Sequence, residues 1–210
     1  MRFRHIAGGL AGVAVAMCGV PAAASAATWD GAPAAASAAT ITPAARPLPA
    51  GVTWHGVPAA GSNAAAGKIP WKRYRTKPWH DAPGKVCAFG VNVTIVRDRE
   101  QYRTLSSYPG GKPRVQEFRG PLYVRYTNTS TGKSMVGNLS GYGWFYYPAG
   151  GGVDIYVPDH IGLTVHAGTK GFPAGEWIVS GRALVIVSSS GANHVVPIHA
   201  TIENVCRMLS

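Results

Sequence analysis

The residues that could support catalysis are spread along the chain, and their spacing matches no catalytic motif. An α/β serine hydrolase needs a G-x-S-x-G turn between a strand and a helix, and Leu139-Ser140-Gly141 lacks the first glycine. The H-E-x-x-H pattern of zinc proteases is absent, and so are phosphate-loop and dinucleotide-binding motifs. We therefore expect no metal, no cofactor and no catalytic residue.

One hydrolytic arrangement stays open as an alternative. His160 and His166 have the same parity along one predicted strand, and Asp154 lies upstream of them. An unrecognised extracellular hydrolase would need these three side chains to converge in a cleft, where they could transfer protons.

A short basic segment with interleaved aromatic residues suggests a different chemistry, the binding of polyanions. Its residues are Trp71, Lys72, Arg73, Tyr74, Arg75, Lys77 and Trp79. Clustered cations attract an anionic cell-wall polymer or an anionic membrane surface, and flat rings add stacking. In the alternative interpretation, the segment is a solvated collar whose aromatic side chains pack on the flank of the following domain.

A second aromatic group lies between residues 142 and 147. Along a strand, Trp144 and Tyr146 face one side, whereas Phe145 and Tyr147 face the other. One pair is expected in the core. The other pair, Trp144 and Tyr146, would then form an exposed platform that suits sugar rings or a partner, unless the linker or the basic segment covers it.

The first 26 residues have the organisation of an export signal. Arg2 and Arg4 precede an apolar stretch from Ile6 to Val20, and Ala24-Ser25-Ala26 supplies the small residues of a cleavage site. The apolar stretch is too short to span a bilayer comfortably, and no later stretch is longer. We therefore expect a secreted or cell-surface protein with no transmembrane segment after cleavage.

Composition divides the remaining chain. The 210 residues include 20 Lys or Arg and 9 Asp or Glu, and loss of Arg2 and Arg4 with the signal leaves a net charge of +9. Ala, Pro, Gly, Ser and Thr dominate residues 27–67, which we expect to be a disordered linker. With 27 Gly and 16 Pro, the composition argues against a coiled coil or a helical bundle.

From residue 85 onward, runs of alternating apolar and polar residues predict β-strands. The runs are 87–95, 122–127, 135–139, 144–147, 153–157, 161–166, 177–179, 183–187 and 196–206, and those at 177–179 and 183–187 are either separate or one strand bent at Gly181. Turn signals such as Pro109-Gly110-Gly111 separate them. This pattern predicts an all-β fold, an antiparallel β-sandwich or barrel of about eight strands. Residues 98–106 are expected to form a short helical turn.

Two cysteines remain after cleavage, Cys87 and Cys206, and in an exported chain they predict one disulfide. Both lie on the apolar faces of the first and last predicted strands, so the bridge would join the two ends of the domain. The chain is thus expected to contain a signal peptide (1–26), a linker (27–67), a basic–aromatic segment (68–84) and a disulfide-stapled β domain (85–210).

The strand motifs follow a particular order. They are C-x-F-x-V from Cys87, G-P-L-Y-V-R-Y-T-N-T-S-T-G-K-S from Gly120, N-L-S-G from Asn138, a Gly-rich turn and a closing cysteine. Over about residues 85–207 this order resembles a family of small exported actinobacterial proteins. The resemblance implies a β-sandwich and export. It implies no catalytic residue, because that family has no established activity.

These features together predict an exported, non-catalytic binding module. Its expected partners are cell-envelope polymers or anionic surfaces, and no specific nucleic acid is expected.

Overall fold

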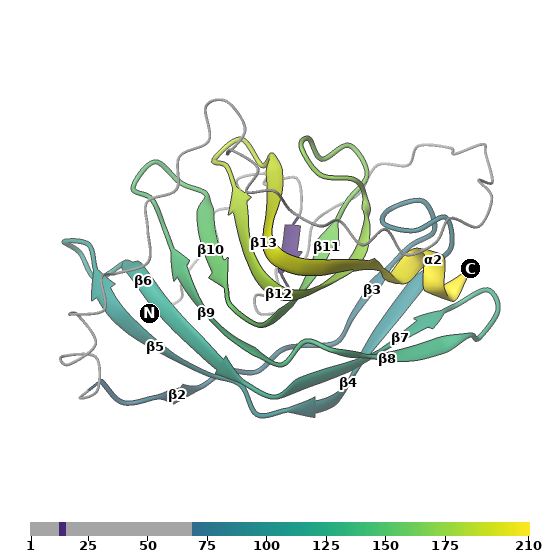
Figure 1. Ribbon diagram of the computed structural model, residues 1–210, viewed down its shortest axis with the longest axis horizontal. Coiled ribbons are helices and arrows are strands. Elements are labelled where there is room, and N and C mark those ends of the chain that lie inside the picture. The colour runs from purple at the N-terminus through teal and green to yellow at the C-terminus, as the bar shows by residue number, and fades with distance from the viewer. Residues whose placement is uncertain (1–12, 16–68) are drawn as a thin grey trace, which may run out of the picture.

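Alternating apolar and polar residues build two antiparallel sheets that pack together (Figure 1). The computed structural model describes residues 13–15 and 69–210. The expected all-β fold, an antiparallel β-sandwich, is confirmed. Its elements are β1 (Val13–Val15), β2 (Lys72–Arg73), β3 (Trp79–Asp81), β4 (Val91–Asp98), β5 (Gln101–Ser107), β6 (Pro113–Gly120), β7 (Leu122–Asn128), β8 (Ser134–Asn138), β9 (Gly141–Tyr146), β10 (Val153–Val157), β11 (His160–Val165), β12 (Gly175–Val187), β13 (Asn193–Asn204) and α2 (Val205–Leu209).

Long strands are shared between the two sheets. The smaller sheet has the order β3-β4-β7-β8, and the larger has the order β1-β11-β12-β10-β9-β6-β5-β2, with β13 paired to β12. Strand β4 runs on into β5, β6 into β7 and β8 into β9, with only one or two residues between the members of each pair (Figure 1). The alternation of side chains along each long strand therefore decides what both sheets bury.

Gly120 lies where β6 passes into β7. Its φ is +128°, a value that L side chains rarely adopt, and a Cβ there would lie 2.5 Å from the carbonyl oxygen of Arg99. The Arg99 backbone N–H also donates a hydrogen bond to the Pro121 carbonyl, at 2.8 Å. This crossing requires glycine, both for its backbone conformation and for the close approach of two backbone segments.

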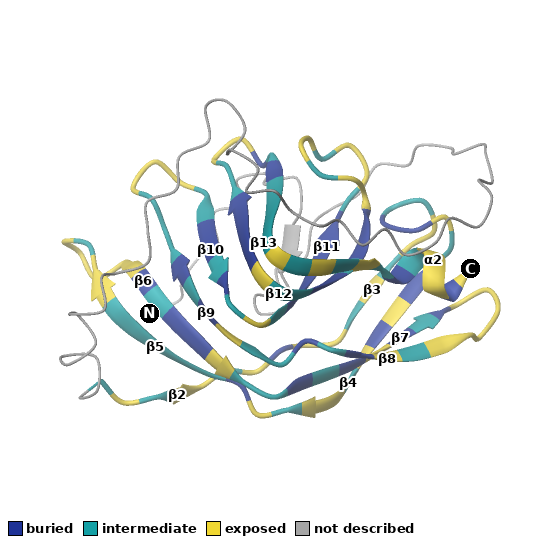
Figure 2. Ribbon diagram, in the orientation of Figure 1, coloured by how far each residue is buried: buried dark blue, intermediate teal, exposed yellow. Residues whose placement is uncertain are grey.

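Two apolar clusters form the interior. One lies between the smaller sheet, β12 and α2 and includes Leu122, Tyr126 and Ile178. The other covers one face of the larger sheet and includes Phe145 and Ile155. Figure 2 shows buried residues recurring along β9, β10 and β12; burial alternates along β9, whereas β12 is buried at consecutive positions on both of its sides.

Three local expectations need correction or refinement. The helical turn expected over 98–106 is wrong, because residues 101–107 form β5, whose polar positions interact with neighbouring strands. Neither cysteine lies on a strand: Cys87 precedes β4, and Cys206 lies in α2, since Asn204 caps a helix by accepting the Arg207 N–H at 3.1 Å. The runs at 177–179 and 183–187 belong to the single strand β12, whose pairing with β13 shifts register after Arg182.

The β structure begins earlier than residue 85. Strand β2 pairs with β5, and β3 pairs with β4, so both sheets include parts of the basic–aromatic segment. The expected signal peptide and linker fall outside the described residues, apart from Val13–Val15. These three residues pair antiparallel with β11.

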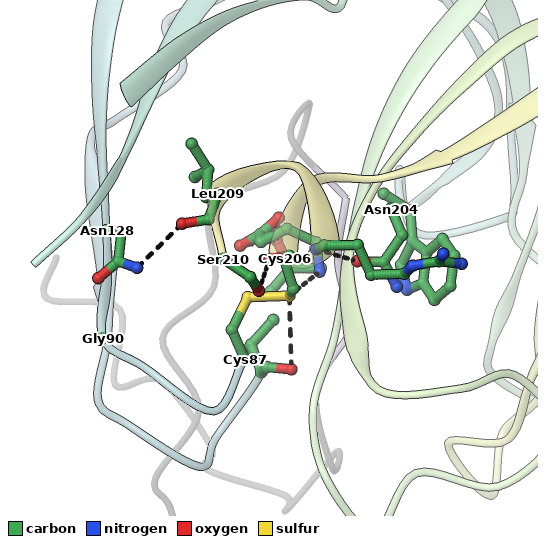
Figure 3. Close-up of a disulfide and its surroundings, with 12 residues drawn as sticks. Cys87, Gly90, Asn128, Asn204, Cys206, Leu209 and Ser210 are labelled. Atoms are coloured by element: carbon green, nitrogen blue, oxygen red, sulfur yellow. Dashed lines mark hydrogen bonds between the residues drawn. A yellow bond between two sulfur atoms is a disulfide. The ribbon is translucent and has the colours of Figure 1, made fainter. Parts of the chain in front are cut away.

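The predicted disulfide is present. Cys87 and Cys206 are joined across a sequence separation of 119 residues (Figure 3). Around it, the Asn128 side-chain amide donates to the Leu209 carbonyl at 3.0 Å, and the Glu176 backbone N–H donates to Cys206 Sγ at 3.4 Å. The bridge and these bonds hold α2 against both sheets.

The crossing at Gly120 gives a prediction about stability. Gly120→Ala should lower the free energy of unfolding by about 3 kcal/mol or more, because backbone strain and a clash with Arg99 add together. Gly110→Ala is the matched control, since Gly110 also has positive φ (+92°) but a Cβ there would have nothing within 4 Å. It should cost only about 1 kcal/mol. Equal losses in urea unfolding would contradict the need for close backbone approach.

A second prediction concerns the disulfide. Cys87→Ala/Cys206→Ala should lower the free energy of unfolding by about 4 kcal/mol, because the unfolded chain regains the freedom of a loop of more than a hundred residues. Reductant should shift the denaturation midpoint of the wild type toward that of the double variant. It should leave the double variant unchanged, and a reductant-insensitive wild type would rule out the stabilising bridge.

Candidate ligand-binding face

Cross-strand register places a row of large polar and aromatic side chains on one face of the larger sheet. Arg103 of β5 lies opposite Glu117 of β6, Glu117 opposite Trp144 of β9, and Trp144 opposite Tyr156 of β10. Directly paired residues point to the same side of a sheet. In the next row of the same face, Arg119 lies opposite Tyr142.

The opposite face of these strands is core. Phe145 is paired with Ile155, and both are buried in the apolar cluster of the larger sheet. Trp144 and Tyr146 therefore point away from this core, as the sequence predicted, and each is half-buried. Tyr147 has the same parity as Phe145 and, as expected, packs partly against the core.

Trp71 brings the basic–aromatic segment onto this face. The guanidinium carbons of Arg119 and Arg103 lie 3.9 Å and 4.5 Å from the centre of the Trp71 ring. Arg103 also forms an ion pair with Glu117 at 2.5 Å, and both side chains are largely buried. Two cation–π contacts and one ion pair thus fix the start of the segment to β5 and β6.

Aromatic contacts continue from there across β9 and β10. The Trp144 ring lies 4.4 Å from that of Tyr142 at an interplanar angle of 68°, and 5.7 Å from that of Tyr156 at 33°. Burial and the carboxylate of Glu117 raise the pKa of Tyr142, so its hydroxyl stays protonated. We call the six residues Trp71, Arg103, Arg119, Tyr142, Trp144 and Tyr156 the aromatic–arginine face.

The rest of the basic–aromatic segment alternates between inward and outward side chains. Tyr74 packs against Phe118 and Tyr102, with ring centres 5.5 Å and 6.3 Å apart. Buried Thr76 donates its backbone N–H to Asp98 Oδ2 at 3.0 Å, and its hydroxyl donates to the carboxylate of Glu100. These inward contacts hold the segment along the edge of the larger sheet.

The cations of this stretch are exposed. Lys72, Arg75 and Lys77 are exposed and form no ion pair with any other residue in the described part of the chain. Arg73 differs, because it pairs with Asp98 at 3.2 Å and donates to backbone carbonyls of the same strand end. Three of the four cations in this stretch are therefore available to an external anion.

Two predicted binding residues belong to the interior instead. Tyr74 packs on the core of the larger sheet and Trp79 on that of the smaller sheet. The Trp79 ring lies 6.4 Å from that of Tyr126, and its indole N–H donates to Glu176 Oε1 at 3.1 Å. The interpretation of the segment as a packed collar therefore holds for these two residues, and we remove them from the candidate ligand surface.

Sequence reasoning missed a buried polar group between the sheets. Glu176 is fully buried, and the Thr164 hydroxyl lies 2.9 Å and 3.1 Å from its two carboxylate oxygens. Burial raises the pKa of Glu176 to about 8. Asp81 and His166 form a 3.0 Å pair nearby. The sequence did indicate that Glu176 is buried, because it lies two residues before the apolar Ile178 on the same strand and so faces the same side of the sheet.

The structure does not bring together the residues of the hydrolase alternative. His160 begins β11 and pairs with its neighbour Asp159 at 2.5 Å, whereas His166 follows the other end of β11 and pairs with Asp81. Asp154 lies on β10, opposite Tyr146 and Ile186. Across residues 69–210, no three His, Cys, Asp or Glu side chains gather as a metal site requires.

Comparison with known proteins adds no family. A scan against family models, a search of curated proteins and a search of solved structures each found no match to the chain. The resemblance to exported actinobacterial proteins stays an expectation, and functional inference depends on the geometry described above.

The buried glutamate gives a prediction about pH. A carboxyl whose pKa is about 8 when folded and 4.5 when exposed contributes stability that is present below pH 4.5 and is lost as pH rises to about 8. Glu176→Gln should remove this slope of about 1.4 kcal/mol per pH unit. Its free energy of unfolding should therefore rise relative to wild type between pH 5 and pH 8, as measured in urea at a series of pH values.

Glu203→Gln is the matched control, because Glu203 is exposed on β13. It should leave the pH dependence of the wild type unchanged. Parallel stability curves for wild type and Glu176→Gln would show that Glu176 does not titrate in this range.

Proposed function

We propose that this protein is an exported, non-catalytic binding module that associates with anionic polymers of the cell envelope. The observation that carries the proposal is the contact of Trp71 with Arg103 and Arg119. Through it, the chain that carries the exposed cations Lys72, Arg75 and Lys77 is attached to the aromatic–arginine face. Charge for long-range attraction and rings for short-range contact are thus neighbours on one molecule.

The disulfide supports the proposed location. Disulfides form and persist mainly in oxidising compartments outside the cytosol, and Cys87–Cys206 joins distant parts of the chain. The leader-like residues 1–26 point the same way. No helix in the described residues is long and apolar enough to cross a membrane.

The basic–aromatic segment follows the edge of the larger sheet, because β2 pairs with β5 and the backbone N–H groups of Tyr74 and Thr76 donate to Glu100 and Asp98. Arg75 and Lys77 therefore present charges in sequence along the sheet edge, where a polymer with repeated anionic groups can meet several of them. A polymer held by several such contacts should dissociate as salt screens them.

The test is sedimentation of the purified exported chain with isolated cell walls, and with vesicles containing phosphatidylglycerol, across a salt series. Lys72→Ala/Arg75→Ala/Lys77→Ala should weaken binding to cell walls about tenfold to hundredfold at low salt, since each surface cation contributes roughly 1 kcal/mol. Binding of the wild type should fall as salt increases.

The matched control is Arg97→Ala/Lys112→Ala/Arg125→Ala, which removes the same charge from exposed positions elsewhere. It should bind cell walls nearly as well as wild type. Equal loss in both variants would indicate a response to net charge alone. Absence of binding to walls at low salt would overturn the proposed function, and binding to vesicles alone would replace the polymer with a lipid surface.

A further inference from the structure

The aromatic–arginine face differs from the sheet edge beside it. The exposed edge offers isolated cations, whereas the face combines aromatic rings in mutual contact with two guanidinium groups and the carboxylate of Glu117. Such a set contacts both the apolar side of a ligand and its polar substituents. A purely ionic ligand would leave the rings unused.

The rings form a shallow corner suited to a pyranose. Tyr142, two residues before Trp144 on β9, stands at a steep angle to it, and Tyr156, opposite Trp144 on β10, is more nearly parallel to it. The C–H groups on one face of a sugar ring can pack on Trp144 while Tyr142 contacts its edge. Tyr142 is 36% exposed, so it is accessible. The Trp144 indole N–H has no hydrogen-bond partner among residues 69–210 and is able to donate one.

The cation nearest to solvent on this face is Arg119. Its guanidinium lies over Trp71 and donates one long bond of 3.3 Å to Gln101, which leaves most of its N–H groups for a ligand. A planar guanidinium matches a carboxylate in two parallel hydrogen bonds. Arg103 is already paired with Glu117, whereas Arg119 forms no ion pair with any residue in the described part of the chain.

We propose that the aromatic–arginine face binds a carboxylated polysaccharide, with a pyranose ring on Trp144 and Tyr142 and a carboxylate on Arg119. This inference rests on the proposed function, because it names the class of anionic polymer involved. It adds that sugar rings, and not charge alone, contribute to recognition. Lys72, Arg75 and Lys77 then attract neighbouring carboxylates of the same polymer.

The experiment uses the exported chain and four soluble probes. Alginate carries pyranose rings and carboxylates, polyphosphate carries charge without sugar rings, dextran carries sugar rings without charge, and oligothymidylate carries both phosphates and stackable bases. The wild type should bind alginate more tightly than polyphosphate and should bind dextran weakly. Quenching of tryptophan fluorescence by alginate should be lost in Trp144→Phe.

Matched variants separate ring contact from folding. Tyr142→Ala and Trp144→Ala should each weaken alginate binding about tenfold and leave polyphosphate binding unchanged. Tyr123→Ala is the control, because Tyr123 lies on β7, in the smaller sheet away from this face. Arg119→Gln should weaken alginate binding, whereas Arg125→Gln, on the smaller sheet, should not. Unchanged circular dichroism would show that each variant is folded.

The outcomes distinguish the two proposals. If neither alginate nor polyphosphate binds, the proposed function fails and this inference fails with it. If both bind equally and the Tyr142 and Trp144 variants behave as wild type, polyanion binding survives and the sugar-binding face is overturned. Tighter binding of oligothymidylate than of alginate, lost in Trp144→Ala, would replace the polysaccharide with single-stranded nucleic acid.

Discussion

The structure depends on three places where a strand leaves one sheet and continues in the other. They fall at residues 99–100, at Pro121 and at residues 139–140. A shift of one residue in any of these strands would exchange its inward and outward side chains in both sheets at once. The crossings are held by backbone contact, as in the hydrogen bond from Arg99 N–H to the Pro121 carbonyl, where Gly120 admits no side chain. The same long strands contribute side chains to both apolar clusters. Their alternation therefore determines both which residues fill the core and which residues lie on the candidate ligand face.

Two further features tie the ends of the chain to this frame. The disulfide holds α2 beside the loop that precedes β4, and Asn128 of β7 bonds to the last turn of that helix. Between the sheets, Glu176 accepts hydrogen bonds from Trp79 of the smaller sheet and Thr164 of the larger. A buried carboxyl that is protonated at neutral pH avoids the cost of a buried charge and still links the two layers.

Alternation predicted the strands well wherever one face is apolar. The fold class and the opposite orientations of Trp144 and Phe145 follow from parity, whereas the disulfide pair followed from the cysteine count alone. Parity failed for β5 and β6, neither of which was predicted as a strand. They form because Tyr102 packs on Phe118 and Arg103 pairs with Glu117 across the two strands. Parity also gave no means of separating Trp71, which lies on the candidate ligand face, from Trp79, which has the same parity and packs on a core. That separation depends on which partner strand each residue meets.

The candidate ligand face is a consequence of the core rather than an addition to it. Phe118 and Phe145 must point inward to fill the cluster of the larger sheet, with ring centres 4.6 Å apart. Their sequence neighbours Glu117, Arg119 and Trp144 are thereby directed to the opposite side. Burial of Phe118 and Phe145 thus fixes the backbone that carries the candidate ligand face. The Arg103–Glu117 ion pair and the contacts of Trp71 then restrict the side chains on that face. A surface fixed in this way loses little conformational entropy when a ligand binds, so a modest number of contacts is enough for recognition.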